Sequence, residues 1–170
     1  VLIIAFSNFA NSAKQEDGLV NDFKAVNNIN NKSSLQRGAK YFVNYCSGCH
    51  SLKYMRMSTL ANDLDIDEET FLKNLMFSDK KIGETMTIAM KESDALLWFN
   101  AVPPDLSLTA RSKGADYIYA KLNTYYEDDN SATGYNNIAY PNTSMPHILA
   151  DLQGGQKLVL DSKNASLRFY

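Results

Sequence analysis

Two cysteines and a histidine stand within five consecutive residues, Cys46-Ser-Gly-Cys49-His50. They include both cysteines of the 170-residue chain, so a fold stapled by several disulfides is excluded. Two thiols at positions i and i+3 of a helical turn can each form a thioether with one vinyl group of a porphyrin, and the next residue then places its imidazole beneath the iron. The motif therefore predicts one covalent haem c, attached through Cys46 and Cys49, with His50 as an axial ligand.

Two other kinds of site also use closely spaced cysteines. A thioredoxin-like redox pair has the same C-x-x-C spacing, but it needs alternating strands and helices, which the surrounding sequence does not show. Zinc could be bound by both cysteines together with the two histidines of the chain, His50 and His147. However, the adjacent residues Cys49 and His50 fit poorly at neighbouring corners of one tetrahedron, and zinc motifs space their ligands differently. Haem is therefore favoured over both.

The iron of such a haem has a sixth position, which is either filled for electron transfer or left open for oxygen or peroxide chemistry. Of the six methionines, Met145 stands in Tyr140-Pro-Asn-Thr-Ser-Met145-Pro-His147, a segment stiffened by two prolines. A stiff loop can present a thioether to iron without collapsing into the core. From the residues alone, Met145 is the preferred sixth ligand and His147 is the alternative.

The rest of the chain indicates a folded, mainly helical domain. The apolar fraction is 45%, the charged fraction 21% and the net charge −2, which argues against a nucleic-acid partner. A capping box of Ser33 and Gln36 predicts the start of a helix that ends at Cys46. The spacing of apolar residues predicts further helices over 67–76, 93–99 and 114–127. Strand signals are weak and the connections are long, above all 128–146, so we expect a mainly α fold with enlarged loops.

The N-terminal part divides into two segments before that domain. Residues 1–13 are apolar and then small, like the second half of a secretory signal, and we expect a signal-peptide remnant there. Residues 14–33 are rich in asparagine, which indicates a linker or an extended arm. The haem domain is then expected over 34–170. No stretch of about 20 apolar residues occurs, so the sequence predicts no transmembrane helix.

Several segments resemble the cytochrome c1 family, the haem subunit of the cytochrome bc1 (ubiquinol–cytochrome c reductase) complex, in its bacterial form. The pairing of the haem motif with a Pro-Pro-Asp-Leu-Ser segment is more specific than the haem motif alone. In chain order the resembling segments are Leu35-Gln-Arg-Gly-Ala39, Tyr45-Cys-Ser-Gly-Cys-His-Ser-Leu52, Gly83-Glu-Thr-Met86, Trp98-Phe99, Pro103-Pro-Asp-Leu-Ser107, Gly114-Ala-Asp-Tyr117, Thr133-Gly-Tyr-Asn-Asn137 and Met145-Pro-His147.

The resemblance implies a cytochrome c-like helical domain with one haem, and His50 and Met145 as its axial ligands. It also implies that Pro104 lies along the haem, and that Arg111, Lys113 and Tyr117 lie near the propionates. The family usually has arginine at the second basic position. Lysine offers a point charge instead of a bidentate fork, so a propionate contact there is less tightly defined. For both basic residues, plain surface charge is the alternative.

The resemblance further implies an electron-transfer subunit that works at the periplasmic face of the bacterial inner membrane. Its partners are cytochrome b, the Rieske iron–sulfur protein that donates the electron, and a cytochrome c that accepts it. Such a subunit makes and breaks no bond, so no catalytic acid or base is expected. The family ends in one membrane anchor that this sequence lacks, and we therefore expect a fragment.

Other interpretations fit part of the pattern. A free-standing soluble c-type electron carrier would have the same haem motif. A haem enzyme such as a peroxidase would need an open axial position in place of Met145. Two acidic runs, 63–69 and 127–129, are candidate docking sites for a basic partner, although a polar helix start and a polar loop explain them equally well.

Overall fold

The computed structural model describes residues 22–160 and 165–169. Within these ranges the chain forms two compact units. Residues 26–112 form one of them, called here the His50 unit, and residues 22–25, 113–160 and 165–169 belong to the other, called the Met145 unit. The segment 1–13, expected to be a signal remnant, and residues 14–21 of the expected linker lie outside the described residues.

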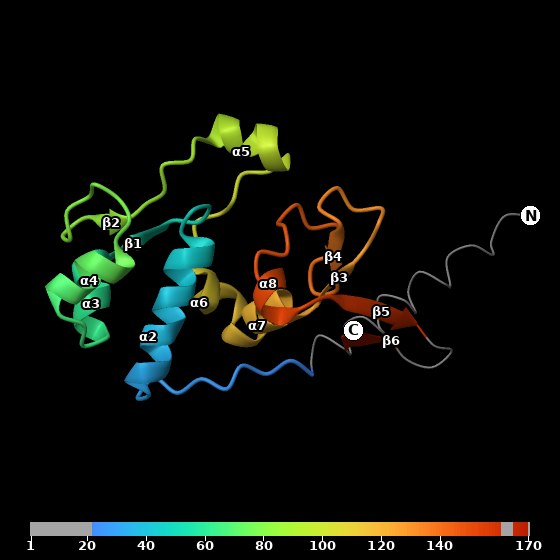
Figure 1. Cartoon of the computed structure of the whole chain (residues 1–170), viewed down its shortest axis with the longest axis horizontal. Coiled ribbons are helices and arrows are strands. Elements are labelled where there is room, and N and C mark those ends of the chain that lie inside the picture. The colour runs from blue at the N-terminus through green and yellow to red at the C-terminus, as the bar shows by residue number, and fades with distance from the viewer. Residues whose placement is uncertain (1–21, 161–164, 170) are drawn as a thin grey trace, which may run out of the picture. The chain divides into compact units, whose positions relative to one another are not determined.

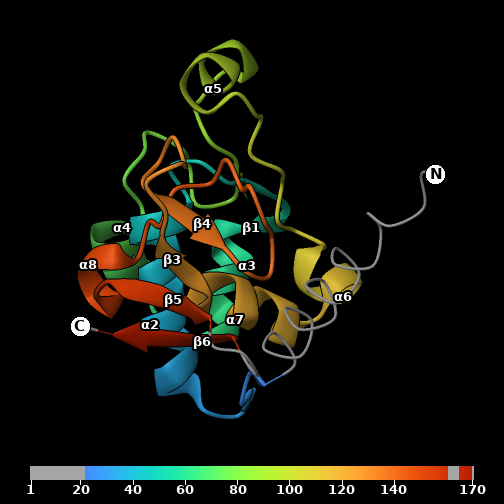
Figure 2. The same cartoon turned by 90° about the vertical axis from the view of Figure 1, so that its right-hand side faces the viewer.

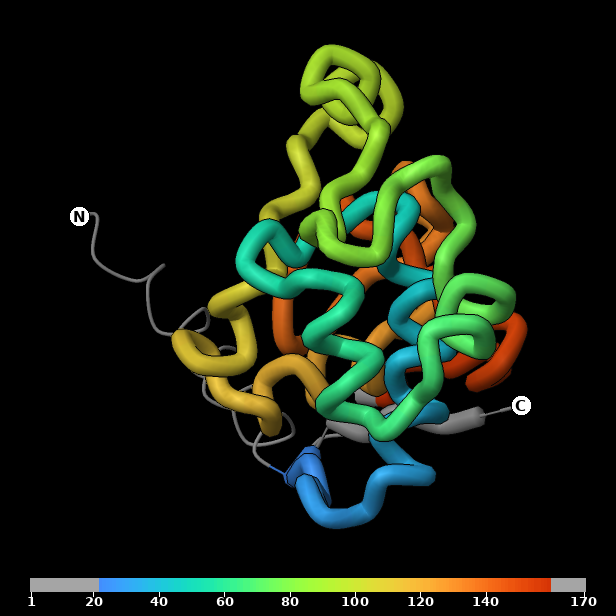
Figure 3. Tube along the Cα trace, turned by 90° about the vertical axis from the view of Figure 1, so that its left-hand side faces the viewer, coloured from blue at the N-terminus to red at the C-terminus, as the bar shows by residue number. Residues whose placement is uncertain are grey.

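The His50 unit is built mainly from short helices (Figure 1). Its strands β1 and β2 pair antiparallel, with Leu52 opposite Met86 and a register shift before Arg56 meets Thr85. Helices α3 and α4 lie beside α2 (Figure 3). The elements are α2 (Lys32–Tyr41), the π-helix η1 (Phe42–Cys46), β1 (Leu52–Arg56), α3 (Met57–Asp63), α4 (Glu68–Leu75), β2 (Thr85–Met86), α5 (Glu92–Phe99) and α6 (Thr109–Lys113), whose last residue already belongs to the Met145 unit.

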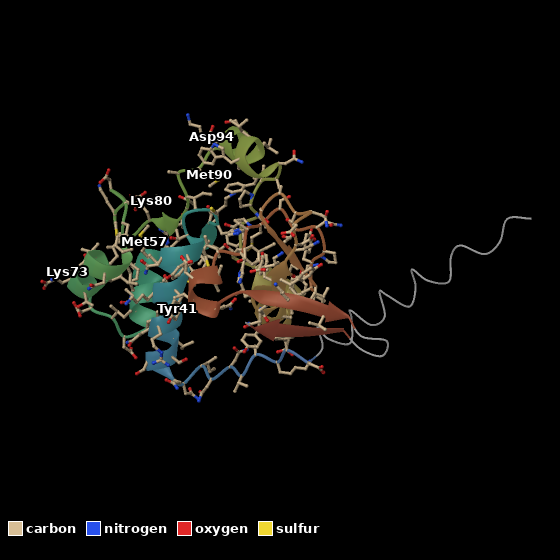
Figure 4. The ribbon with its side chains drawn as sticks, turned by 45° about the vertical axis from the view of Figure 1, so that its right-hand side comes forward. Tyr41, Met57, Lys73, Lys80, Met90 and Asp94 are labelled. Atoms are coloured by element: carbon tan, nitrogen blue, oxygen red, sulfur yellow. The ribbon has the colours of Figure 1, made fainter. Side chains whose placement is uncertain are left out.

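A hydrophobic core joins η1, α3, α4 and β2. Phe71 of α4 is fully buried at its centre. Figure 4 shows Met57 of α3 inside this cluster and Lys73 of α4 extending away from it. The buried members of the core are Val43, Met57, Ala61, Phe71, Leu75 and Met86. The core fixes the end of η1, where the haem motif begins.

The helix starts show which sequence signals decide local structure. Helix α4 begins as predicted, because the Asp67 side chain accepts the Thr70 N–H at 2.9 Å. The prediction for α2 was wrong in its cap. Asn31, not Ser33, is the N-cap and accepts the Ser34 N–H at 3.1 Å, while Gln36 donates to a distant backbone carbonyl instead of closing a capping box.

Helix α5 confirms the helix predicted over 93–99, and it stands apart from α2, α3 and α4 (Figures 1 and 2). Met90 lies in the segment that leads to it and Asp94 lies on it (Figure 4). Its side chains Leu96, Leu97 and Trp98 are exposed. The helix ends at Asn100, which adopts a left-handed conformation with φ 52°.

The Met145 unit combines one main helix with two antiparallel ladders (Figure 2). Tyr125 pairs with Asn137 at the start of the β3–β4 ladder. Residues 22–25 are held against the helix, since the Ala25 N–H donates to Asp116 at 2.9 Å. The elements are α7 (Ala115–Asn123), β3 (Tyr125–Glu127), β4 (Tyr135–Asn137), α8 (Ala150–Gln153), β5 (Gln156–Leu160) and β6 (Ala165–Phe169).

The helix predicted over 114–127 is too long. Helix α7 ends at Asn123, and the residues that follow form β3. The run Thr124-Tyr125-Tyr126 is β-branched and aromatic, a composition that favours a strand when a partner such as β4 is available. Tyr125, expected on a helix face, therefore lies in a strand.

Among the described residues, more lie in helices than in strands, which agrees in part with the predicted mainly α fold. Three two-stranded ladders accompany them, which the sequence analysis did not predict. Within the described ranges, no helix combines the length and the apolar character that crossing a bilayer requires.

Candidate functional site

The haem motif forms a helical turn at the end of η1. The Cys46 carbonyl accepts the N–H of Cys49 at 3.1 Å and the N–H of His50 at 2.9 Å. The two cysteines therefore lie at i and i+3 of one turn, as the spacing predicted. This turn overlaps the end of the π-helix, where the Ser47 N–H donates to the carbonyl of Phe42, five residues earlier, at 2.9 Å. Single π-turns of this kind occur frequently at functional sites.

The surroundings of the cysteines give no support to the two alternatives. Both are free, and burial, together with the nearby Cys49 thiol, raises the pKa of Cys46. Reactive C-x-x-C pairs instead have a lowered thiol pKa. Among the described residues, no three His, Cys, Asp or Glu side chains gather where they could hold a metal ion, so the zinc interpretation has no cluster to support it.

His50 is oriented by a backbone carbonyl far along the chain. Its Nδ1 lies 2.8 Å from the carbonyl oxygen of Pro104. Because a carbonyl can only accept, Nδ1 carries the hydrogen and donates, which leaves the lone pair of Nε2 free to bind a metal. The backbone next to Pro104 is itself fixed, since the Leu106 N–H donates to the Ser51 carbonyl at 2.9 Å.

Asp105 holds the segment that supplies this carbonyl. Its carboxylate accepts the Lys53 N–H at 2.9 Å and the Ser107 N–H at 3.0 Å. The Ser107 hydroxyl oxygen in turn accepts the Tyr54 N–H at 3.1 Å. Desolvation alone raises the pKa of Asp105, but the hydrogen bonds from Ser107 and Lys53 outweigh it and lower that pKa. Pro104 is thus positioned by a carboxylate that stays ionised.

These residues fit a haem c. Two free thiols stand at i and i+3 of a helical turn, and the imidazole that follows has its Nδ1 engaged by a carbonyl, so that Nε2 is the ring nitrogen left to bind a metal. This is the donor set that covalent attachment and axial ligation require.

Met145 lies in the Met145 unit, in the segment between β4 and α8, and its side chain is half-buried. Its N–H donates to the Thr143 hydroxyl at 3.3 Å, and its carbonyl accepts the Tyr125 hydroxyl at 3.1 Å. The Thr143 hydroxyl also accepts a hydrogen bond from the Lys121 ammonium at 3.4 Å. The same ammonium lies 4.1 Å from the centre of the Tyr140 ring. The backbone of the predicted ligand is therefore tied down on both sides.

His147 is a packed aromatic residue. It is buried, with its ring stacked on Tyr125 at 4.6 Å and 8° and edge-on to Tyr135 at 5.1 Å and 72°. Its Nε2 has no hydrogen-bond partner among the described residues. Burial lowers the pKa of His147, which favours the neutral ring.

Asn137 is a structural residue of the Met145 unit that the sequence analysis did not single out. It is fully buried, and its amide donates to the Lys121 carbonyl at 2.7 Å. Its side-chain oxygen accepts the Tyr140 N–H at 2.9 Å and the Thr124 hydroxyl at 3.3 Å. The signal for it was the segment Thr133–Asn137, which resembled the family but had no role assigned to it.

The residues expected near the propionates have different settings. Arg111 is exposed on α6 in the His50 unit. Lys113 is exposed and lies 5.8 Å from the centre of the Tyr117 ring, so the structure brings these two together. Desolvation, and then Tyr140, raises the pKa of Tyr117, which keeps its hydroxyl protonated.

Each acidic run contains a residue with a structural role. Asp67 caps α4 through Thr70, and Asp128 accepts the side-chain amide of Asn136 at 2.9 Å and the N–H of Asn130 at 3.0 Å. These hydrogen bonds lower the pKa of both carboxyl groups. Part of the acidic pattern therefore reflects local folding.

Comparison with known proteins settles the family. The sequence model of the cytochrome C1 family matches residues 22–159. The chain belongs to the cytochrome c1 family. Over 133 residues, 78% of this chain and 54% of the relative, it is 51% identical to cytochrome c1 of Allochromatium vinosum. Over 127 residues, 75% of this chain and 54% of the relative, it is 43% identical to a protein of Nitrosomonas europaea named ammonia monooxygenase gamma subunit.

The chain spans about half the length of the curated relatives it matches. Membership of the cytochrome c1 family implies a haem c cofactor, in agreement with the donor set formed by Cys46, Cys49 and His50.

Proposed function

We propose that this chain is the haem-bearing part of the electron-transfer subunit of a bacterial cytochrome bc1 complex. It takes one electron from the Rieske iron–sulfur protein and passes it to a cytochrome c. Haem c, when bound, supplies an iron that cycles between ferric and ferrous states. The cytochrome c1 family membership and the donor set of the haem motif support this function.

The single observation that carries the proposal is the hydrogen bond from His50 Nδ1 to the Pro104 carbonyl. It leaves Nε2 as the metal-binding nitrogen and fixes the plane of the imidazole ring. Cys46 and Cys49 would form the two thioethers, and Pro104 would lie beside the haem through its contact with His50. These four residues act by binding and orienting the group.

Met145 is proposed as the second axial ligand. Its backbone is held at both the N–H and the carbonyl, which suits a side chain that must reach a fixed point. A thioether opposite an imidazole raises the reduction potential compared with two nitrogen ligands, as electron transfer to a cytochrome c requires. We accordingly propose residues 34–170 as one cytochrome c-like haem domain.

The remaining partners follow from the same function. Arg111, Lys113 and Tyr117 are proposed near the haem propionates, where two cations and a protonated hydroxyl would neutralise and bind carboxylates. We also propose that the subunit lies beside cytochrome b at the periplasmic face of the inner membrane. The acidic runs 63–69 and 127–129 would attract a basic cytochrome c.

The ligand assignment is tested by Met145→Ala in the haem-loaded protein. We expect the haem to stay attached, the reduction potential to fall and the ferrous iron to bind carbon monoxide, because one axial position opens. The matched control is Met90→Leu, a half-buried methionine before α5 (Figure 4), which should behave as the parent does. An unchanged spectrum and potential in Met145→Ala would overturn the assignment.

The electron path needs the assembled complex. Addition of a quinol should reduce the haem of this subunit rapidly, and depletion of the Rieske protein should abolish that reduction while leaving reduction by dithionite intact. Equal rates with and without the Rieske protein would refute the proposed donor.

A further inference from the structure

We propose that Tyr125, together with the His147 ring stacked on it, is the positioning residue for Met145 and sets how firmly the Met145 thioether holds the haem iron. This inference rests on the proposed function, because it takes Met145 as the axial ligand. Neither the haem motif nor the family segments described above give Tyr125 a role.

The first support is the hydrogen bonding of the Met145 peptide. The Met145 N–H donates to the Thr143 hydroxyl at 3.3 Å, within the same loop. The Met145 carbonyl accepts the Tyr125 hydroxyl at 3.1 Å, and Tyr125 lies twenty residues earlier, on β3. Of these two contacts, the one from Tyr125 ties the loop to a structural element outside it.

The second support is the stack that follows. His147, two residues after Met145, lies parallel to the Tyr125 ring with centroids 4.6 Å apart. Tyr135 of β4 meets the same imidazole edge-on at 5.1 Å. Pro146 joins the two residues with a fixed φ, so an anchored His147 restricts the direction of Met145. Tyrosines from both strands of the β3–β4 ladder thus hold the loop.

Tyr125 is itself fixed independently of Met145. Only 1% of its surface is exposed, and its backbone pairs with Asn137 in the ladder. Its carbonyl accepts the Gln156 side-chain amide at 3.1 Å, and the same amide donates to the Asn123 carbonyl at the end of α7 at 3.1 Å. The hydroxyl that reaches Met145 therefore starts from a rigid frame.

A neutral thioether is a weak ligand, and its hold on iron depends on how little freedom the loop regains when the bond breaks. A loop tied to β3 stays close to its bound conformation after the thioether dissociates. Rebinding of Met145 to the iron therefore costs little conformational entropy. Loss of one hydrogen bond of ordinary strength should shift the equilibrium between iron-bound and dissociated Met145 by about two- to tenfold.

The test uses haem-loaded protein of the full chain and measures the affinity of the ferric form for imidazole, which competes with Met145. Tyr125→Phe removes only the hydroxyl. We expect it to bind imidazole about two- to tenfold more tightly and to weaken the methionine-to-iron charge-transfer absorbance. Tyr54→Phe, at an exposed tyrosine of the other unit, should leave both quantities unchanged.

The stack is tested separately, which also covers the case that Tyr125→Phe folds poorly. His147→Ala should tighten imidazole binding, and His147→Phe, which can stack, should restore the parental affinity. In a Met145→Ala background, none of these substitutions should alter imidazole affinity further, because the competing ligand is gone.

The outcomes separate the two proposals. If Met145→Ala changes imidazole affinity but Tyr125→Phe and His147→Ala do not, the positioning role is wrong and the axial assignment stands. A fall in thermal stability without a change in affinity or absorbance has the same meaning. If Met145→Ala itself leaves imidazole affinity unchanged, the axial assignment fails and the positioning role fails with it.

Discussion

His50 and Pro104 are joined by a hydrogen bond of 2.8 Å between an imidazole nitrogen and a backbone carbonyl. The two residues come from the two most specific segments of the sequence, the haem motif and the Pro-Pro-Asp-Leu-Ser segment. The bond explains why these segments belong together, since one supplies the imidazole proposed as an iron ligand and the other sets the tautomer of that ring. Both lie within the His50 unit.

Asp105→Ala should loosen this arrangement. Without the carboxylate, the amides of Lys53 and Ser107 lose their acceptor and the Pro104 carbonyl is less well placed. A weaker hydrogen bond to His50 lowers the basicity of the ring, so we expect the reduction potential to rise. Redox titration of the haem-loaded protein measures this. Asp79→Ala, at an exposed aspartate, is the control, and equal potentials in the two variants would contradict the prediction.

The stabilising contribution of Asp105 should disappear in acid. Its pKa in the folded protein lies below its usual value, so its ionised form contributes stability that is fully present above the unfolded pKa of about 3.9. That contribution is lost as the pH falls through the folded pKa. We expect the difference in unfolding free energy between the parent and Asp105→Asn to shrink below about pH 4, measured by urea denaturation across a pH series. A difference that grew with acidity would have the wrong sign.

Phe71→Ala should destabilise the His50 unit strongly. The ring is fully buried in the core of η1, α3, α4 and β2, and its removal leaves a cavity there. The expected loss is about 3–5 kcal/mol of unfolding free energy, measured by denaturant titration. The neighbouring Leu72→Ala, on the exposed side of the same helix, should lose much less. Similar losses at both positions would mean that Phe71 is not the centre of the core.

Asn137→Ala should destabilise the Met145 unit. The substitution removes a fully buried side chain and leaves the part-buried Lys121 carbonyl and Tyr140 N–H without their partner. We expect a loss of about 1–3 kcal/mol, visible as a lower Tm. Asn62→Ala, at an exposed position of α3, controls for the chemistry of the substitution. Equal Tm values in the two variants would show that other groups replace Asn137.

Local signals were sufficient for part of this structure. The haem turn, α4 and α5 follow from residues within a few positions of one another, and each was predicted near its observed bounds. The cap of α2 was misplaced by two residues, because Asn31 and Ser33 are both good caps and only the folded backbone distinguishes them.

The contacts that position the candidate site could not be read from the sequence. His50 meets Pro104 across 54 residues, and Tyr125 reaches Met145 across 20. Tyr125 also shared a helical period with α7, and the pairing of β3 with β4 overrode that period. Such pairings depend on tertiary structure, which a single sequence does not display.

The π-helical turn η1 fixes the angular phase of the haem motif. In a regular α-helix, Cys46 would continue the apolar stripe of Ala39, Phe42 and Val43 into the core. The turn that closes from the Ser47 N–H to the Phe42 carbonyl holds one more residue than an α-helical turn, so the residues that follow it are set back by roughly the 100° that one residue spans. Val43 is buried and Cys46 is only half-buried. The same helix thus buries Val43 in the core and leaves both cysteines half-buried at its end. The extra residue of the π-turn decides on which side of the helix the rest of the haem motif lies.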